Sequence, residues 1–242
     1  MKAIILAGGS GTRGRPFTDY FPKAMIPIEE KPLIDYITRY LSSFSFIKEI
    51  IILADYKGLG NQIKSYLENR KDLKKISFVQ DSNSGTGGDL AHLLSHIKDK
   101  EFVLWFVDNL CAINLKDMYE FHKKKKGIAC IATRRYRTEE TGHAIVKDGV
   151  ILEFKEKPTI RLEMPECLGI YILKTDILKM IKAKKTKRKN INLSYDILQE
   201  LSKKYTISAF DIGKTPWIDV ESPIKVERDY KSINDIIRKM KN

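Results

Sequence analysis

Four apolar runs, spaced by helix-like segments, constrain the fold of this chain most strongly. The runs are KAIILA from residue 2, KEIIILA from residue 48, KKISFVQ from residue 74 and EFVLWFVDN from residue 101. Strands that are apolar throughout belong to sheets covered on both faces, and their alternation with amphipathic helices is typical of parallel sheets. We therefore predict an α/β, Rossmann-like fold, with a mostly parallel central sheet and helices on both faces.

Helical spacing of apolar residues predicts the segments between these strands, and the pattern changes after residue 126. Strand-like runs with short polar turns follow there: GIACIATRRY, HAIVKDG, VILEFKEK and ECLGIYILK. We expect a mixed β portion packed beside the first half, within a single domain spanning residues 1–242. The predicted helices lie at residues 33–41, 63–67, 90–97, 115–126, 176–182, 194–204 and 224–240, with a short strand, TISAFDI, before the last of them.

The charge of the chain favours anionic partners. Its 242 residues include 44 Lys and Arg against 31 Asp and Glu, a net charge of +13. The three cysteines, Cys111, Cys130 and Cys167, have neither disulfide-framework nor metal-ligand spacing, which fits a reducing compartment. The apolar run before Gly8 is too short for a signal peptide, and no run approaches a membrane span. We expect a soluble, cytoplasmic protein that does not bind membranes.

The loop LAGGSGTRGRPFTDYFPK, residues 6–23, follows the first apolar run and fits a dinucleotide-binding pattern. Residues 9–14 read G-x-G-x-x-G, which requires a helix that begins inside the motif and points at a pyrophosphate. Pro16, Pro22 and Pro27 oppose such a helix, because each lacks an N–H and pushes the preceding residue away from helical geometry. The dinucleotide interpretation is therefore disfavoured.

A P-loop is disfavoured as well. Arg15 and Pro16 stand where that motif needs Lys and Ser or Thr, so the hydroxyl that binds magnesium is missing. An extended glycine loop, with Arg13 inside it and Lys23 beyond it, is the interpretation that remains. Glycines let backbone N–H groups crowd an anion, and two cations suit the spread charge of a triphosphate.

The same segment, extended to LAGGSGTRGRPFTDYFPKAMIPI, closely resembles the signature of the sugar-1-phosphate nucleotidyltransferases, also called nucleoside-diphosphate-sugar pyrophosphorylases. That signature is roughly L-A-G-G-x-G-T-R-x-x-P-x-T-x-x-x-P-K-x-x-x-P, and the spacing matches throughout. The resemblance implies an enzyme of the EC 2.7.7 type that transfers a nucleotidyl group from a nucleoside triphosphate to a hexose 1-phosphate and releases pyrophosphate. Residues 1–125 would mainly bind the nucleotide and residues 126–242 mainly the sugar phosphate.

The resemblance also assigns roles to loop residues. Arg13 and Lys23 would be catalytic contacts to the phosphates of the nucleotide. Six further residues of the loop would bind the nucleotide: Leu6, Ala7, Gly8, Gly9, Gly11 and Thr12.

The run QDSNSGTGGDLAHLL resembles the base-recognition segment of this family, which implies that Gln80, Gly85 and Thr86 bind the nucleotide. A Gln amide offers both a donor and an acceptor, which suits the edge of uracil or thymine. Gln80 therefore favours UTP or dTTP. Gly87 stands where the family has alanine, and Asp89 is also a departure from the family pattern.

Two aspartates match the metal-binding positions of the family. Asp108 ends LWFVDN, where Val107 replaces the usual glycine, and Asp219 lies in PWIDVESP. The resemblance implies that both are catalytic and together hold Mg²⁺, a hard cation that prefers oxygen ligands. The implied reaction is in-line attack of a sugar-1-phosphate oxygen on the α-phosphorus of the nucleotide.

Later motifs resemble the sugar-phosphate site of the family. TGHAIVKDGVILEFKEKP would supply Gly142, Glu156 and Lys157, and CLGIYIL would supply Gly169, with Cys167 in place of the usual asparagine. Glucose 1-phosphate is the favoured substrate. A mannose-1-phosphate guanylyltransferase, or another base and sugar pair within the family, stays an alternative. Homo-oligomers are compatible with the resemblance.

Two interpretations of other classes stay open. The departures at Val107, Asp89 and Cys167 would fit a catalytically weak nucleotide-sugar sensor. The basic runs 123–126 and 182–190 would fit a nucleic-acid-binding protein, although nucleic acid is not the expected partner because no aromatic residues are interleaved with them. We further expect a short form of the family, without the C-terminal β-helix domain of longer relatives.

Overall fold

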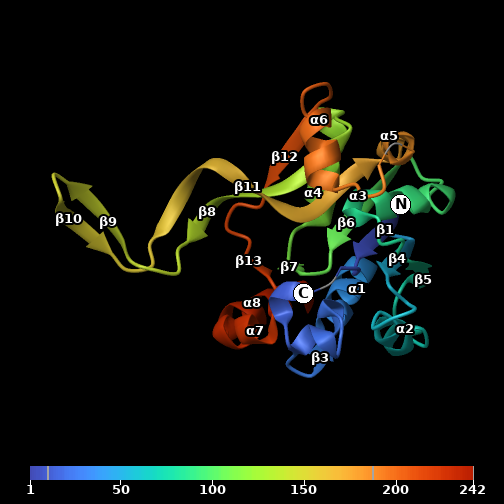
Figure 1. Ribbon diagram of the computed structural model, residues 1–242, viewed down its shortest axis with the longest axis horizontal. Helices are drawn as coiled ribbons and strands as arrows, with labels where there is room; N and C mark the ends of the chain where they lie inside the picture. Colours follow the sequence, from blue (N-terminus) through green and yellow to red (C-terminus); the bar gives the residue numbers. More distant parts are fainter. Residues whose placement is uncertain (10, 187, 242) are drawn as a thin grey trace.

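A computed structural model describes residues 1–9, 11–186 and 188–241, which form a central sheet of seven strands in the order β12-β8-β11-β6-β1-β4-β5 (Figure 1). All strands of this sheet run in the same direction except β11, which is antiparallel to both of its neighbours. The α/β, mostly parallel sheet is confirmed. Ser10 in the glycine motif and Lys187 in the basic run lie outside the described residues. The strands are β1 Lys2–Leu6, β4 Glu49–Ala54, β5 Lys75–Gln80, β6 Glu101–Phe106, β8 Ala129–Thr138, β11 Thr159–Lys174 and β12 Ile207–Asp211.

Helices cover both faces of the sheet because its inner strands are apolar on both sides. Ile5 and Trp105 face a core that includes residues of α1, α2, α4 and α8, while Ile4 and Leu104 face a second core with residues of α3 and α5. The helices are α1 Leu33–Ser43, α2 Asn61–Leu67, α3 Gly85–Ala91, α4 Leu115–Lys125, α5 Asp176–Lys185, α6 Gln199–Leu201, α7 Pro223–Arg228 and α8 Tyr230–Lys241. None of the helices in the described ranges combines the length and apolar content needed to cross a bilayer.

The helix predicted at 90–97 begins earlier than expected. α3 starts at Gly85, and after Ala91 the chain tightens into a 3-10 turn, His92–Ser95. The backbone N–H groups of Gly87 and Gly88 donate to the carbonyl of Ile191 at 2.8 and 3.3 Å. This close approach depends on a segment distant in sequence, so local periodicity could not reveal it.

The last two predicted helices are also divided. The segment predicted at 194–204 is a π-helical turn, Leu193–Leu198, followed by the short α6. The helix predicted at 224–240 is α7 and α8, separated at Asp229, whose φ of −99° and ψ of 16° leave helical geometry. The Asp229 carboxylate pairs with Arg228 at 3.2 Å.

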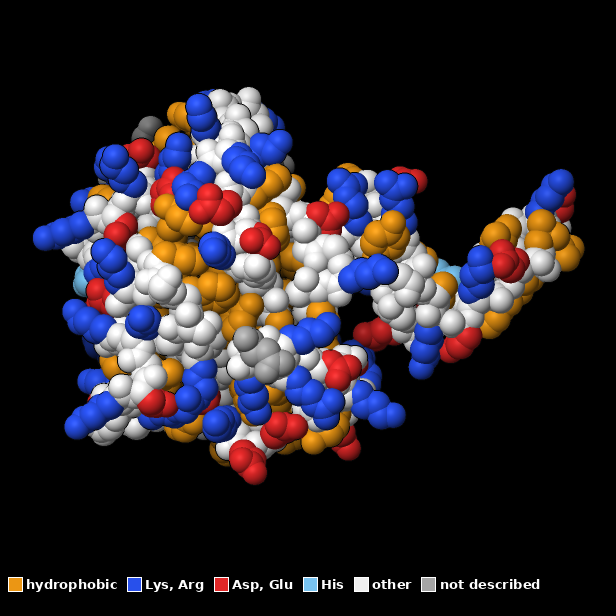
Figure 2. Space-filling model, turned by 180° about the vertical axis from the view of Figure 1, so that it is seen from behind, with side chains coloured by type: hydrophobic (Ala, Val, Ile, Leu, Met, Phe, Trp, Pro, Cys, Tyr) orange, Lys and Arg blue, Asp and Glu red, His pale blue; other side chains and the backbone are white. Residues whose placement is uncertain are grey.

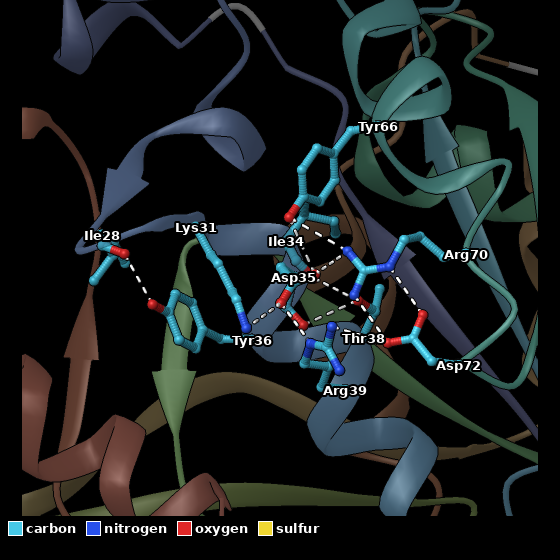
Figure 3. Close-up of polar contacts among 10 residues, drawn as sticks. All are labelled: Ile28, Lys31, Ile34, Asp35, Tyr36, Thr38, Arg39, Tyr66, Arg70 and Asp72. Carbon is cyan, nitrogen blue, oxygen red and sulfur yellow. Dashed lines mark hydrogen bonds and ion pairs between the residues drawn. The ribbon is translucent and has the colours of Figure 1, made fainter.

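A buried carboxylate ties α1 to the segment after α2 (Figure 3). The Asp35 side chain is completely buried and accepts from Arg39 Nε at 2.7 Å and from Arg70 Nη1 at 2.7 Å. Tyr66 donates its hydroxyl to the same carboxylate at 3.2 Å, and Arg70 also pairs with Asp72. Because removing one partner of a buried ion pair costs about 3–5 kcal/mol, this network holds α1 and the segment after α2 together.

The second half does not form a separate layer beside the first. β8, β11 and β12 belong to the central sheet, and the outer halves of β8 and β11 leave it together with a hairpin of β9 (His143–Lys147) and β10 (Val150–Lys155). Figure 1 shows this hairpin projecting well away from the body. Its turn places Asp148 and Gly149 at φ of 52° and 79°, as tight hairpin turns require. We call residues 134–166 the arm.

Candidate active site

The two predicted metal aspartates meet at the carboxyl ends of the parallel strands. Asp108 follows β6, which lies beside β1 and therefore beside the glycine loop that β1 leads into. A short strand, β13 (Trp217–Asp219), pairs antiparallel with β7 (Asn109–Cys111) and places Asp219 opposite Asn109. The backbone N–H of Val220 donates to the Asp108 carbonyl at 2.6 Å. Backbone pairing thus brings two distant segments of the chain to one point.

The two predicted cations lie beside these aspartates. Lys23 Nζ is 3.3 Å from Asp108 Oδ2, and this lysine side chain is largely buried. Arg13 Nη1 is 3.8 Å from Asp219 Oδ2 and also pairs with Glu221, while most of the Arg13 side chain is exposed. All four side chains predicted to be catalytic therefore lie in one cluster, which we call the carboxylate site.

Glu221 was not predicted from the sequence, and it is one of the groups that raise the pKa of Asp219. Burial is the main cause that raises the pKa of Asp219 to about 7, and a hydrogen bond with Glu221 and the charge of Asp108 contribute to that rise. The hydrogen bond from Asp219 lowers the pKa of Glu221, as does the nearby Arg13. The only sequence signal was a carboxylate two residues after Asp219.

Asn109 holds the carboxylate site in shape and was also missed. Its Nδ2 donates to Asp108 Oδ1 at 2.9 Å, and its Oδ1 accepts from the Gly169 backbone at 3.0 Å and from the Trp217 indole at 2.8 Å. A Cβ atom on Gly169 would collide with the Asn109 amide, so this position needs glycine. Gly169, predicted to bind sugar phosphate, therefore lies beside the two aspartates.

The glycine loop borders a small cavity next to Lys23. In the described part of the loop no α-helix forms, and the chain makes 3-10 turns at Thr12–Gly14, Phe17–Asp19 and Lys23–Met25, in line with the rejection of a dinucleotide motif. The left-handed φ angles of Gly9 (117°) and Gly11 (58°) explain the need for glycine there. The cavity has a volume of about 160 Å³ and is lined by Ala7, Gly8, Gly9, Gly11, Thr18, Pro22, Lys23, Asp55, Leu59 and Gly60. Two further predicted residues flank this lining in the sequence. Leu6 ends β1 directly before Ala7, and Thr12 follows Gly11.

The predicted base-recognition residues already have partners within the protein. Gln80 Nε2 donates to Asp55 Oδ1 at 2.9 Å, and its Oε1 accepts from the Tyr56 backbone at 3.0 Å. Thr86 Oγ1 accepts from the Leu193 backbone at 3.0 Å, and Gly85 packs against Ile191. A base that bonded to the Gln80 amide would have to displace Asp55, which itself lines the cavity.

A second acidic pair lies beneath the glycine loop. The Asp81 carboxylate fills the space where a Cβ of Gly8 would stand, which accounts for glycine at that position. Burial is the main cause that raises the pKa of Asp81 to about 6, and the charge of Asp89 contributes to that rise. Asp89 accepts from Ser82 and Ser84, so this residue, which departs from the family pattern, holds the turn that leads into α3.

The other predicted sugar-phosphate residues lie in the arm and are not brought to the carboxylate site. Gly142 packs against the ring of Phe154 and against Glu156, and Lys157 follows at a φ of 46°. Within the described ranges, no hydrogen bond or ion pair joins Gly142, Glu156 or Lys157 to either metal aspartate. An ion pair between Arg228 and Glu140, 2.9 Å long, connects the base of the arm to α7.

A larger cavity lies at the opposite ends of the parallel strands. It has a volume of about 660 Å³ and is lined by Lys126, Gly127, Ile128, Lys174, Asp176, Lys179, Met180, Lys204, Tyr205 and Thr206. Ile128 precedes β8 and Lys174 ends the antiparallel β11, so this cavity borders the amino ends of the parallel strands. Ligands of open α/β sheets bind at the carboxyl ends, which favours the smaller cavity as the site of chemistry.

Comparisons with known proteins point to one family. A family model described as "Nucleotidyl transferase" matches residues 2–228. The chain is 30% identical over 200 residues to a UTP–glucose-1-phosphate uridylyltransferase of Synechocystis sp., covering 75% of this chain and 51% of that protein. It is 32% identical over 159 residues to the D-glycero-alpha-D-manno-heptose 1-phosphate guanylyltransferase of Aneurinibacillus thermoaerophilus, covering 65% of this chain and 68% of that protein.

A third relative and a solved structure extend these findings. Mannose-1-phosphate guanylyltransferase 1 of Arabidopsis thaliana is 31% identical over 194 residues, covering 77% of this chain and 53% of that protein. The crystal structure of a putative glucose-1-phosphate thymidylyltransferase from Bacillus anthracis superimposes with a TM-score of 0.75 at 21% identity, covering 98% of this chain and 95% of that one. The chain thus spans about half the length of two of these relatives and shares the fold of the solved structure.

Proposed function

Because the chain belongs to the nucleotidyl transferase family, we propose that it transfers a nucleotidyl group from a nucleoside triphosphate to a sugar 1-phosphate. The observation that carries this proposal is the pairing of β13 with β7, which sets Asp219 opposite Asn109 and so beside Asp108. Two relatives named for different sugar-1-phosphate substrates, glucose and heptose, support the same reaction class.

The residues of the carboxylate site fit the demands of this reaction. A sugar-1-phosphate oxygen attacks the α-phosphorus, the bond from that phosphorus to the bridging oxygen breaks, and pyrophosphate leaves. Backbone N–H groups of the glycine loop and Lys23 would bind the triphosphate, and Arg13 would leave Glu221 to stabilise the charge growing on pyrophosphate. No general base is needed, since a phosphate monoester is largely ionised at neutral pH.

The carboxylate site also fits Mg²⁺. Among the described residues, Asp219 Oδ1 is buried with no hydrogen-bond partner, an oxygen that a cation would satisfy. No group of three or more His, Cys, Asp or Glu side chains in the described ranges is arranged as a complete metal cage. Magnesium commonly takes one or two carboxylates and completes its shell with phosphates and water, so Asp108 and Asp219 would suffice to hold it. The bound ion would neutralise phosphate charge.

For the base and the sugar, we propose UTP or dTTP with glucose 1-phosphate. The support is the Gln80 amide at the end of β5, once it releases Asp55, and the relative named for UTP and glucose 1-phosphate. The alternative is guanylyl transfer to mannose 1-phosphate or a similar sugar, which the names of two other relatives favour.

A substrate panel tests both levels of this proposal. Nucleoside triphosphates are paired with hexose 1-phosphates, with magnesium and with a chelator, and pyrophosphate release is measured. The proposal predicts release that depends on magnesium and is fastest with UTP or dTTP; release fastest with GTP would support the guanylyl alternative. If no pair gives turnover while the chain binds RNA tightly and with steep salt dependence, the transferase proposal is wrong.

A further inference from the structure

The larger cavity is lined mainly by lysines, and none of the residues assigned to the proposed reaction borders it. Its volume of about 660 Å³ lies within the range of small-molecule sites, roughly 300–1,000 Å³. Four of its ten lining residues are basic and one is acidic. We call it the lysine cavity. Its lysines are Lys126, Lys174, Lys179 and Lys204, and its acidic residue is Asp176.

The order of the strands in the sheet brings these lysines together. Strands β12, β8 and β11 are neighbours, so the segment before β12, the segment before β8 and the end of β11 meet at one edge. Ile128 donates its backbone N–H to the Thr206 carbonyl at 2.9 Å, and Lys174 donates to the Ile128 carbonyl at 2.9 Å. Because neighbouring strands are about 4.8 Å apart, the segments that carry Lys126, Lys174 and Lys204 lie within roughly 10 Å across the sheet.

The turn after α4 allows this close approach. Lys126 ends the helix in the left-handed region, at a φ of 54°, which is uncommon for a residue with a side chain. A Cβ atom on Gly127 would lie 2.5 Å from the Thr206 carbonyl oxygen, so only glycine fits between the two segments. This turn holds Lys126 beside the segment that leads from Lys204 into β12.

Three of the four lysines have no acidic partner in the part of the chain that the structure describes. Lys179 Nζ pairs with Asp176 at 2.8 Å, which leaves Lys126, Lys174 and Lys204. Like charges around one hollow repel one another, and a bound anion would remove this repulsion. The lysine cavity is therefore complementary to an anion with several charges.

Glu101 is the acidic residue placed to neutralise Lys174, and it contacts another group. Glu101 stands opposite Lys174 where β11 pairs with β6. Its Oε1 atom lies 3.2 Å from Nε2 of His122, whose side chain is buried. The charge of Lys174 therefore stays available to a ligand.

The lysine cavity differs from the general basic surface. Figure 2 shows Lys and Arg side chains spread over the face of the body that it presents. Solvated lysines on a convex surface specify no ligand, whereas the lysine cavity sets its cations around a hollow with an aromatic ring. That ring belongs to Tyr205, which is 46% exposed, and Met180 adds apolar surface. Stacking on an exposed aromatic ring beside cations is a common way to bind a nucleotide.

The lysine cavity is separate from the carboxylate site. Glu101, opposite Lys174, begins β6, and Asp108 lies two residues beyond the end of that strand. Seven residues of extended chain span roughly 20 Å. A small molecule in the lysine cavity would therefore leave Asp108 free for its own ligand.

We propose that the lysine cavity binds a nucleoside diphosphate, with Lys126, Lys174 and Lys204 on its phosphates and Tyr205 under its base. A diphosphate carries a charge of roughly −3 at neutral pH, which matches three unpaired lysines. Lysine ammonium groups donate charge-assisted hydrogen bonds to phosphate oxygens. No bond is made or broken in this cavity.

Isothermal titration calorimetry of the full chain with ADP, in the absence of magnesium, tests the proposal. Lys174→Ala combined with Lys204→Ala should weaken ADP binding roughly 100-fold, since each change removes a hydrogen bond to a charged group. The matched control is Lys231→Ala combined with Lys239→Ala, which removes the same charge from exposed positions of α8 and should leave the Kd unchanged.

Two further variants locate the ligand and its base. Binding should persist in Lys23→Ala, because Lys23 borders only the smaller cavity. Tyr205→Ala should weaken ADP binding roughly tenfold and leave the binding of inorganic pyrophosphate unchanged, because only ADP has a base to stack. Tyr205→Phe keeps the ring and should bind ADP like the wild type. Circular dichroism checks that each variant is folded.

Four results would overturn the proposal. The first is no ADP binding in folded Lys23→Ala, and the second is equal weakening by the two double variants, which would reduce the effect to net charge. The third is unchanged ADP affinity in Tyr205→Ala, which would leave an adventitious anion only. The fourth is single-stranded RNA that binds more tightly than ADP and is lost in the Lys174 and Lys204 double variant. Because no turnover is measured, the outcome is independent of the proposed transfer reaction.

Discussion

The carboxylate site and the arm differ in how their residues are held, although the same family resemblance singled out both. Asp108, Asp219 and Gly169 lie on or next to paired strands, and the sheet register brings them together. Glu156 and Lys157 lie beyond the sheet, in an arm joined to the body by β8 and β11. The comparison teaches that strand pairing alone, which continues through the arm, does not bring a motif residue to the site unless its strands lie within the body of the protein.

The two regions also differ in energetic character. Burial and neighbouring charges raise the pKa of Asp219 to about 7, so the ionised form of this carboxyl group is unfavourable in the folded protein. The arm keeps its charges in water, where ion pairs such as Lys155 with Glu153 contribute little. The electrostatic cost is therefore concentrated at the carboxyl ends of the strands. In the arm, the unfavourable feature is the exposed apolar surface.

The largest expected effect is a loss of turnover at the carboxylate site. Asp108→Asn should lower kcat by roughly 100-fold or more, the scale of losing one preorganised electrostatic contact. Asp235→Asn, the same change at an exposed position of α8, should leave kcat unchanged. Pyrophosphate release at saturating substrates measures both variants. Wild-type kcat in Asp108→Asn would remove Asp108 from the chemistry.

A smaller loss is expected from Asn109, which touches Asp108 and positions it. Asn109→Ala should lower kcat by roughly 10- to 100-fold with little change in KM, as for groups that orient a metal ligand. Asn109→Asp keeps the acceptor for Gly169 and Trp217 but cannot donate to Asp108, so it should be equally impaired. An Asn109→Asp variant with normal kcat would show that the bond to Asp108 is not needed.

In the arm, Lys157→Ala should act on substrate binding. We expect KM for the sugar 1-phosphate to rise roughly tenfold, the value of one hydrogen bond to a charged group, with KM for the nucleotide unchanged. Steady-state kinetics with each substrate varied in turn give the two constants. A 100-fold fall in kcat with unchanged KM would instead place Lys157 in the carboxylate site during turnover and would break the comparison.

The smallest effect is on stability. The pKa of Asp219 lies near 7 in the folded protein and at 3.8 in the unfolded chain, so the folded state holds a proton that the unfolded chain has released. Stability from this group is present below about pH 4 and is lost as pH rises to 7.

Asp219→Asn removes this dependence, so its Tm should match wild type near pH 4 and exceed it by a few degrees at pH 8. Glu156→Gln, in the arm, is the control and should leave Tm unchanged at both pH values. Thermal denaturation without metal measures the shifts. A lower Tm for Asp219→Asn at pH 8 would contradict the buried, repelled carboxylate.

Sequence patterns predicted the elements that depend on runs of neighbouring residues or on a regular spacing of residues. The four apolar runs gave the parallel strands, and the spacing of the signature gave Arg13 and Lys23, which do lie beside the aspartates. Patterns could not predict Asn109 or Glu221, because their importance comes from partners such as Gly169 and Arg13 that are distant in sequence. For the same reason, periodicity missed the start of α3, which depends on Ile191.

The central claim is that Asp108 and Asp219 act as one unit, and a double-mutant cycle tests it most directly. Pyrophosphate release is measured for Asp108→Asn, Asp219→Asn and the chain with both changes. If the two carboxylates serve one shared ion, the double variant should lose no more kcat than the worse single variant, because the first change already disables the unit. Losses that multiply, so that the logarithms of the two single effects add in the double variant, would show that the two aspartates act independently and would contradict the account.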